Sequence, residues 1–305
     1  DQEFFVVEGI QREPFGIQAS AGVKSEDLKR EGEFQKMRRG GWEPGSRVVD
    51  MDADRVDAEV LYPTLCFTMW RVPDLAYQNA CMRAYNDWMV DFANGAPGRL
   101  VGLGLVSLLD IGVGVQELKR MASRGLGGAC ISAIAPSDRP YSDPAYDPFW
   151  AAAQELDMPL SLHIFTGTRS EFEGTDFISN YAMVPRWIQS TLGTMIVSGV
   201  LERFPKLKLI SVEVDIGWIP TFIHRLDHAY DRHRHWSGSG ADLTMRPSEY
   251  FHRQVYATFM DDEPGIKVRH DSGVDNIMWS SDYPHSVSTW PRSTYKRCPP
   301  GGARP

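Results

Sequence analysis

Three polar side chains, each placed at the end of a run rich in apolar residues, are of the types that bind metals or transfer protons. They are His163, Glu213 and Asp282. An imidazole or a carboxylate in such a place binds a divalent metal or activates a water molecule. Structural roles are open as well: a hydrogen-bonded histidine for His163, an ion pair with an arginine for Glu213 and a helix N-cap for Asp282.

A second histidine lies close to Asp282 in the sequence. His285 follows it by three residues in the segment Ser-Asp-Tyr-Pro-His. Two roles are open for His285, as a partner of the Asp282 carboxylate or as a polar residue that makes contacts within its loop. The sequence slightly favours the loop contact.

Other patterns that could carry chemistry are weaker. His224 and His228 have the i,i+4 spacing of metal-binding HExxH helices, but Arg225 stands where that motif has its glutamate. We therefore expect both histidines on an exposed helix face, opposite apolar residues such as Ile223. The chain contains no GxGxxG, Walker A or GxSxG nucleophile pattern, so a nucleotide cofactor and serine-hydrolase chemistry lack support.

The elements that must position these residues follow an alternating pattern. Segments with helical periodicity, among them 75–94, 188–204 and 218–230, separate seven short apolar or β-branched runs. This alternation predicts an α/β fold with a parallel sheet, in which the side chains that follow the strands meet at one face. The seven predicted strands are 58–62, 100–106, 128–133, 159–163, 208–213, 255–259 and 276–279.

Composition excludes several classes of protein. The chain has 305 residues, of which 42% are hydrophobic and 24% charged, and its net charge is −8. Its lysines and arginines are scattered, which argues against a nucleic-acid partner, and it has no apolar stretch of about 18 residues that would span a membrane. A small-molecule substrate fits better. The four cysteines form no CxxC pair, so we expect free thiols and a cytoplasmic protein.

The domain organisation is predicted to be simple. Short Pro/Gly-rich stretches offer no linker, so we expect a single barrel domain over 1–305. Within it, 1–47 form an irregular N-terminal insertion with a small hairpin at 4–7, and 48–292 form the barrel. The last segment, 293–305, is rich in helix breakers and is expected to be a frayed tail.

Longer motifs resemble a known family. They are Val200-Leu-Glu-Arg-Phe-Pro-Lys, Ser211-Val-Glu-Val-Asp-Ile-Gly-Trp and Met278-Trp-Ser-Ser-Asp-Tyr-Pro-His. As a set they resemble the amidohydrolase-related (amidohydrolase 2) family, which includes relatives of aminocarboxymuconate-semialdehyde decarboxylase. The resemblance implies a distorted (β/α)8 TIM barrel that binds a divalent metal, usually zinc. It also implies hydrolysis or nonoxidative decarboxylation of a small organic acid, possibly aromatic or unsaturated, or of a related carbonyl compound.

The resemblance also assigns roles to residues. His163 matches the metal-binding histidine after strand five, and Asp282 matches the aspartate after strand eight that binds the metal or takes a proton. With these assignments, His163 and Asp282 are the expected metal ligands, and Asp282, Glu213 and His285 are the expected catalytic residues. We expect His163 and Asp282 within about 6 Å of each other at the barrel mouth, with Glu213 nearby.

The chain departs from the family pattern in three places. No histidine precedes His163, so an Asp-x-His-x-His first strand is missing; a His-Gly-Gly segment after strand six is replaced by Glu213-Val-Asp-Ile-Gly; and no closing helix follows residue 292. We therefore expect a truncated barrel that lacks its first strand and closing helix, binds metal weakly and associates, as a homodimer, through its exposed edges. The alternative is a metal-free, catalytically inactive binding or scaffold barrel.

Overall fold

The computed structural model describes residues 3–167 and 176–293, and the chain divides into two compact units. Unit 1 is formed from Asp1–Gly104 together with Trp279–Pro305, and unit 2 is Leu105–Met278. The predicted tail, apart from residue 293, lies outside the described residues. No helix among the described residues is both long and apolar enough to cross a membrane.

The framework of unit 2 is a six-stranded sheet with the strand order β10-β9-β8-β7-β6-β5. Strands β6 to β9 pair in parallel with their neighbours. Every residue of β6 and β7 is buried, as expected of a parallel sheet, because such a sheet is covered on both faces. The strands are β5 Gly104–Leu105, β6 Ala129–Ser132, β7 Leu160–His163, β8 Leu209–Val212, β9 Val255–Phe259 and β10 Ile277–Trp279.

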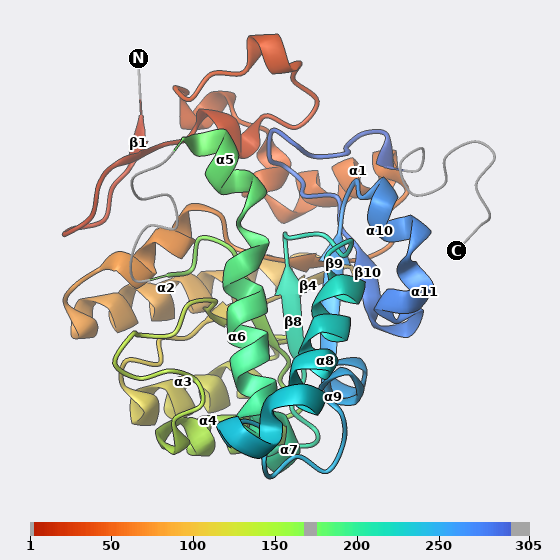
Figure 1. The fold of residues 1–305 in the computed structure, drawn as a ribbon. Helices are drawn as coiled ribbons and strands as arrows, with labels where there is room; N and C mark the ends of the chain where they lie inside the picture. The colour runs from red at the N-terminus through yellow and green to blue at the C-terminus, as the bar shows by residue number, and fades with distance from the viewer. Residues whose placement is uncertain (1–2, 168–175, 294–305) are drawn as a thin grey trace. The chain divides into compact units, whose positions relative to one another are not determined.

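Helices connect these strands. Helices α3 and α4 pack on each other, as do α8 and α9 (Figure 1). The helices are α3 Ile111–Ser123, α4 Asp147–Glu155, α5 Phe177–Ala182, α6 Pro185–Val197, α7 Val200–Arg203, α8 Ile219–Ser237, α9 Pro247–Gln254, α10 Glu263–Lys267 and α11 Arg269–Ser272, with 3-10 turns η6 Pro144–Tyr146 and η7 Val274–Asn276.

Two of the predicted helices have different limits in the structure. The helix predicted over 188–204 is two helices, α6 and α7, because Gly199 adopts a left-handed conformation with φ of 76° and interrupts it. The helix predicted over 218–230 continues to Ser237 in α8 and ends at Gly238, which is also left-handed. The predicted faces of α8 are confirmed, since His224 and His228 are exposed.

Unit 1 contains a second, two-stranded parallel sheet, in which β3 (Glu59–Leu61) pairs with β4 (Leu100–Gly102). The predicted run 100–106 is therefore divided between β4 and β5. Helix α2 (Leu75–Asn94) has the predicted limits: the Asp74 side chain accepts a hydrogen bond from the Tyr77 N–H at its start, and Gly95 follows its last residue.

Residues 3–43 are less regular, as predicted for the insertion at 1–47, although they are not without structure. The hairpin predicted within 4–7 has its second strand further along, because β1 (Phe4–Phe5) pairs antiparallel with β2 (Glu13–Pro14). The irregular region ends earlier than residue 47, since helix α1 (Pro44–Asp54) begins with a proline in its first turn. Four 3-10 turns precede it, η1 Gly16–Ala19, η2 Ser25–Asp27, η3 Phe34–Lys36 and η4 Arg39–Gly41, and η5 Leu65–Arg71 follows β3.

The described cysteines are free thiols, as predicted. Cys66 and Cys81 are partly buried and Cys130 is buried. Burial raises the pKa of Cys66 to about 12 and raises that of Cys130 further. A thiol with a raised pKa has little thiolate at neutral pH and is a poor nucleophile or metal ligand, so neither side chain is a candidate for chemistry.

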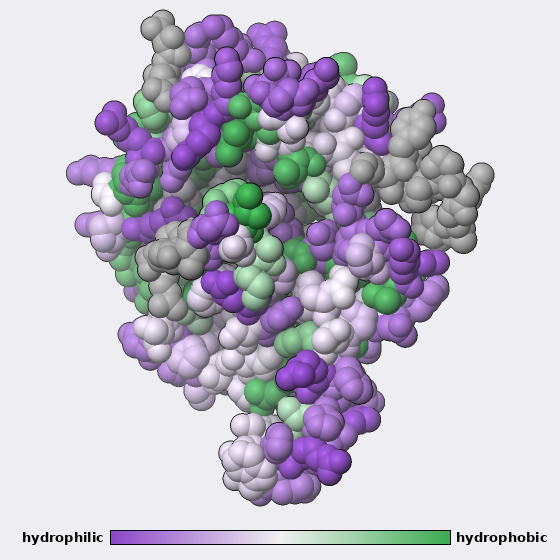
Figure 2. Space-filling model, turned by 45° about the horizontal axis from the view of Figure 1, so that its top comes forward, coloured by the Kyte–Doolittle hydropathy of each residue, from purple (hydrophilic) through white to green (hydrophobic). Residues whose placement is uncertain are grey.

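The face of the molecule drawn in Figure 2 is mostly polar. Polar residues predominate on the face drawn in Figure 2, and apolar residues form small groups between them. Helix α5 is an exception, because Phe177 and Ile178 on it are 65% and 77% exposed, whereas its Asn180 is buried. Exposed apolar side chains that lie next to one another are typical of a contact surface.

Candidate active site

The first group of site residues lies at the carboxyl ends of β7 and β8 in unit 2. The Nε2 atom of His163 lies 2.8 Å from Oε2 of Glu213. The other ring nitrogen, Nδ1, lies 2.7 Å from the carbonyl oxygen of Ile164, to which it donates a proton. Nε2 is therefore the nitrogen that is available to a cation, because the tautomer is set by the bond at Nδ1.

The contact between Nε2 and the Glu213 carboxylate has a chemical consequence. Both atoms present lone pairs when the imidazole is neutral and the carboxylate is ionised. The lone pairs of Nε2 and of the carboxylate oxygen repel each other. A proton or a metal ion bound by both atoms replaces this repulsion with an attraction. The pair is thus a place that suits a bound cation, and it is mostly enclosed, with 6% of the His163 side chain and 21% of the Glu213 side chain exposed.

Backbone strain occurs at the same strand ends. Phe165 and Glu213 have φ angles of 65° and 61°, in the left-handed region that bulky residues rarely adopt. The N–H of Glu213 donates to Oγ1 of Thr258, at 3.2 Å. Such strain persists only where the surrounding contacts enforce it, and it is common in active sites.

Buried threonines enforce the conformation after β7. The Thr166 hydroxyl donates to the carbonyl oxygen of His163 and accepts the N–H of Ala133, at 2.6 and 2.7 Å. Thr191, in α6, donates to the carbonyl oxygen of Ala133 at 2.6 Å. These bonds join the ends of β6 and β7 and fix the backbone of the His163 segment.

Carboxylates organise the loop after β8. Asp262 accepts the N–H groups of Ile216 and Gly217, at 2.9 and 2.7 Å, and Asp215 accepts the N–H of Met260, at 3.2 Å. Desolvation raises the pKa of Asp215, and the charges of nearby carboxylates, including that of Glu213, add to the rise. The loop therefore concentrates negative charge beside Glu213, which favours a cation.

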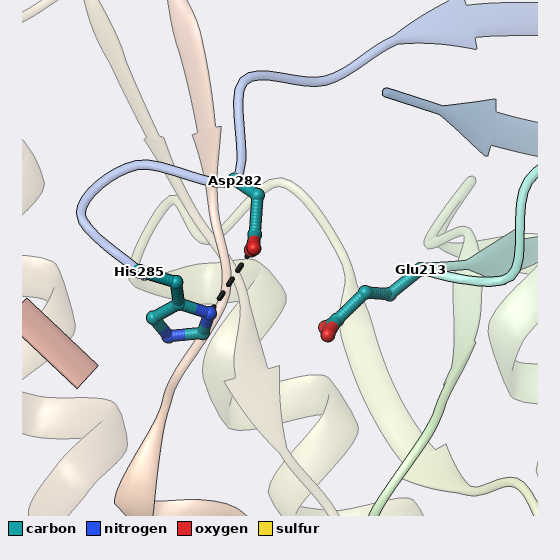
Figure 3. A group of neighbouring side chains, drawn as sticks. All are labelled: Glu213, Asp282 and His285. Atoms are coloured by element: carbon teal, nitrogen blue, oxygen red, sulfur yellow. Dashed lines mark ion pairs between the residues drawn. The ribbon is translucent and has the colours of Figure 1, made fainter. Parts of the chain in front are cut away.

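The second group of site residues lies in unit 1, after β10. Nδ1 of His285 lies 3.0 Å from Oδ1 of Asp282, and the two side chains face each other across their loop (Figure 3). Nε2 of His285 lies 3.0 Å from the hydroxyl oxygen of Thr64, the third residue after β3. Asp282 has a φ of 53°, the same left-handed conformation as Glu213.

Helix α1 holds this loop. The guanidinium of Arg47 lies over the ring of Tyr283, 4.5 Å from its centre, and donates to the Tyr283 carbonyl oxygen at 3.3 Å. Arg47 also pairs with Glu59 of β3 at 2.6 Å, and both side chains are about nine-tenths buried. The Tyr283 hydroxyl donates to Asp50. Tyr283, the residue next to Asp282, therefore contacts α1 directly and is linked to β3 through Arg47.

The structure tests the structural alternatives that the sequence left open for Glu213, Asp282 and His285. Glu213 has a histidine, His163, as a partner, and none of the described helices has Asp282 as its N-cap. His285 is a partner of the Asp282 carboxylate, the role that the sequence slightly disfavoured. The sequence patterns did not point to Thr64, Arg47 or Thr258 as residues of the site. Thr64 alone carried a signal, because it follows a predicted strand as the other site residues do.

Comparison with known proteins decides the family. The sequence profile of the Amidohydrolase family matches residues 13–298. The chain belongs to the amidohydrolase family. This confirms the family and the enzyme class predicted from the motifs. It also confirms the predicted fold class, because the parallel sheet agrees with the TIM-barrel fold of amidohydrolases.

Similar members of the family are decarboxylases. The 2-amino-3-carboxymuconate-6-semialdehyde decarboxylase of Dictyostelium discoideum is 24% identical over 264 residues, which cover 82% of this amidohydrolase and 69% of the relative. The crystal structure of 5-carboxyvanillate decarboxylase from Sphingomonas paucimobilis is 26% identical, with a TM-score of 0.66, over 80% of this chain and 74% of the other.

A further solved structure agrees in fold. It is a dihydroxybenzoic acid decarboxylase from Polaromonas sp. JS666, described with bound manganese and the inhibitor 2-nitroresorcinol. It is 20% identical to this amidohydrolase, with a TM-score of 0.67, over 81% of this chain and 76% of the other. Its similarity supports the barrel fold.

Proposed function

We propose that this amidohydrolase is a metal-dependent, nonoxidative decarboxylase of a small aromatic or unsaturated carboxylic acid. The observation that carries the proposal is that similar proteins, found by sequence and by structure, act on acids of this class. We further propose that the residues after β7, β8 and β10 serve as active-site residues, because the active sites of TIM barrels lie at the carboxyl ends of their strands.

In this proposal His163 and Asp282 hold the metal. Their donors fit a divalent cation, since Nε2 of His163 is directed by the hydrogen bond that Nδ1 makes with Ile164, and the Asp282 carboxylate is oriented by its contact with His285. A bound divalent metal supplies a Lewis acid that holds oxygen atoms of the substrate and stabilises their negative charge. Imidazole and carboxylate ligands suit both zinc and manganese, and zinc is the metal that we propose.

The reaction requires one proton. The bond between the carboxyl carbon and the carbon that bears it breaks, carbon dioxide leaves, and the electron pair that remains on that carbon takes up a proton. We assign the proton donor to Asp282, which recovers a proton from His285 through the Nδ1–Oδ1 contact, while His285 recovers one from water. Glu213 stands beside His163 as a base or proton store, at the place where decarboxylases of the family have a histidine.

Metal analysis and assays test this function. We expect purified protein to contain divalent metal and to release carbon dioxide from 5-carboxyvanillate or a dihydroxybenzoic acid. A chelator should abolish the activity, and added zinc or manganese should restore it. Protein that contains less than stoichiometric metal and is unaffected by chelation would instead support the scaffold alternative. Consumption of an ester or amide with no release of carbon dioxide would indicate hydrolysis.

We also propose that the chain forms a homodimer in the cytoplasm. The free thiols of Cys66, Cys81 and Cys130 are typical of a reducing compartment. The exposed apolar residues of α5, Phe177 and Ile178, provide a surface for self-association. Sedimentation velocity should give twice the mass of one chain, and Ile178→Glu should shift the protein to monomer. A monomeric parent protein, or recovery of the native protein from an oxidising compartment, would contradict these proposals.

A further inference from the structure

Thr64 uses its hydroxyl in an unusual way. It immediately precedes the 3-10 turn η5, in the N-cap position, yet its side chain makes no capping hydrogen bond. Threonine at such a position usually accepts a backbone N–H of the first turn. Here the hydroxyl oxygen instead lies 3.0 Å from Nε2 of His285, which is 221 residues away in the chain. The Thr64 hydroxyl therefore contacts His285, a distant site residue, in place of a local capping hydrogen bond.

We infer that Thr64 is a positioning residue that fixes the ring of His285 against the Asp282 carboxylate. This inference rests on the proposed function, in which Asp282 and His285 belong to the active site. With Thr64 on one nitrogen and Asp282 on the other, both 3.0 Å away, the imidazole is held at both ends. Rotation of the ring would break both contacts at once.

The hydroxyl group suits this position because it can donate a hydrogen bond. Nδ1–H of His285 donates to the Asp282 carboxylate, and the Thr64 hydroxyl donates to the lone pair of Nε2. Both ring nitrogens therefore have a partner in one orientation of the ring.

The loop that carries His285 supports this role. The backbone N–H of His285 donates to the carbonyl oxygen of Asp282 at 2.9 Å, so the two residues form one turn. A quarter of the His285 side chain is exposed, which gives water access to the ring, whereas 13% of the Asp282 side chain is exposed. The largely enclosed Asp282 carboxylate therefore contacts a ring that its own turn and Thr64 hold in place.

Nitrogen NMR of the histidine rings tests the contact without an activity assay. We would label histidine with 15N in zinc-saturated protein at about pH 8, above the ordinary range of histidine titration. The signals of His285 are assigned by their loss in His285→Gln. The parent protein and Thr64→Ser should show the Nδ1–H tautomer with Nε2 shifted by an accepted hydrogen bond. That shift should disappear in Thr64→Val, and an unchanged Nε2 signal would refute the inference.

Kinetics test the consequence of this positioning for the reaction. With 5-carboxyvanillate or a dihydroxybenzoic acid, Thr64→Val should lower kcat about 5- to 10-fold, the effect of one lost hydrogen bond, with KM within about twofold. Thr64→Ser should restore most of kcat. Thr68→Val is the matched control, because the Thr68 hydroxyl donates to the Leu65 carbonyl oxygen in the same turn. Unchanged kcat in Thr64→Val, or an equal loss in Thr68→Val, would overturn the positioning role.

The two measurements separate failure of this inference from failure of the proposed function. If neither acid is decarboxylated while the Nε2 shift depends on the Thr64 hydroxyl, the decarboxylase proposal fails and the Thr64–His285 contact is supported. If the acids are decarboxylated and the Nε2 shift does not depend on Thr64, the function stands and the inference fails. Thermal unfolding of each variant confirms that the comparison is made between folded proteins.

Discussion

Replacing His163 with alanine is expected to lower kcat/KM by about 10³-fold or more and to remove binding of a divalent metal at this site. The imidazole is one of two metal ligands in the proposed site, and stabilisation of charge by a catalytic metal is worth several kcal/mol, with each 1.36 kcal/mol equal to a tenfold change in rate. Calorimetric titration with zinc and with manganese, together with the decarboxylation assay, measures both effects.

The control for this experiment comes from the exposed face of α8. His224 and His228 are exposed and spaced i,i+4, so they could bind added zinc at the surface. The titrations are therefore made in a His224→Ala/His228→Ala background, which should retain full activity. Equal tight affinity with and without His163 would contradict its role as a ligand. The titrations are repeated with Glu213→Gln. This variant keeps the shape of the side chain that contacts Nε2 of His163 and removes its charge.

Replacing Arg47 with methionine is expected to lower the free energy of unfolding by about 3–5 kcal/mol. The variant leaves the buried carboxylate of Glu59 without its partner, 2.6 Å away, and removes the support of the Tyr283 carbonyl group. Removing one member of a buried ion pair costs more than the pair contributes, because an uncompensated charge remains. Urea unfolding of the parent and the variant measures the difference.

A double variant distinguishes the buried charge from other effects. Arg47→Met/Glu59→Met removes both charges and should recover much of the lost stability. Lys267→Met, which breaks the exposed pair between Lys267 and Glu263, should leave the unfolding midpoint unchanged. Arg47→Met with the stability of the parent protein would show that the buried pair does not hold α1 to β3. Because Tyr283 adjoins Asp282, we also expect kcat of Arg47→Met to fall.

The sequence by itself determined the elements and the family. Strands such as β6, β7 and β8 are short runs that contain several apolar residues, and α2 lies between Asp74 and Gly95, so both kinds of element depend on neighbouring residues. The motifs around Glu213 and Asp282 are likewise contiguous. Features of this kind are visible in a single chain because their physical causes act over a few residues.

Only the tertiary structure decided which side chains are partners. Glu213 pairs with His163 across adjacent strands β7 and β8, and His285 contacts Thr64 across 221 residues of sequence. The sequence favoured a loop contact for His285. It contained no sign that α1 contacts the loop after β10 through Arg47 and Tyr283. Tautomers, strained backbone and buried ion pairs arise when distant segments pack together. They depend on the positions of atoms that residue spacing does not specify, because the chain reaches them only after folding.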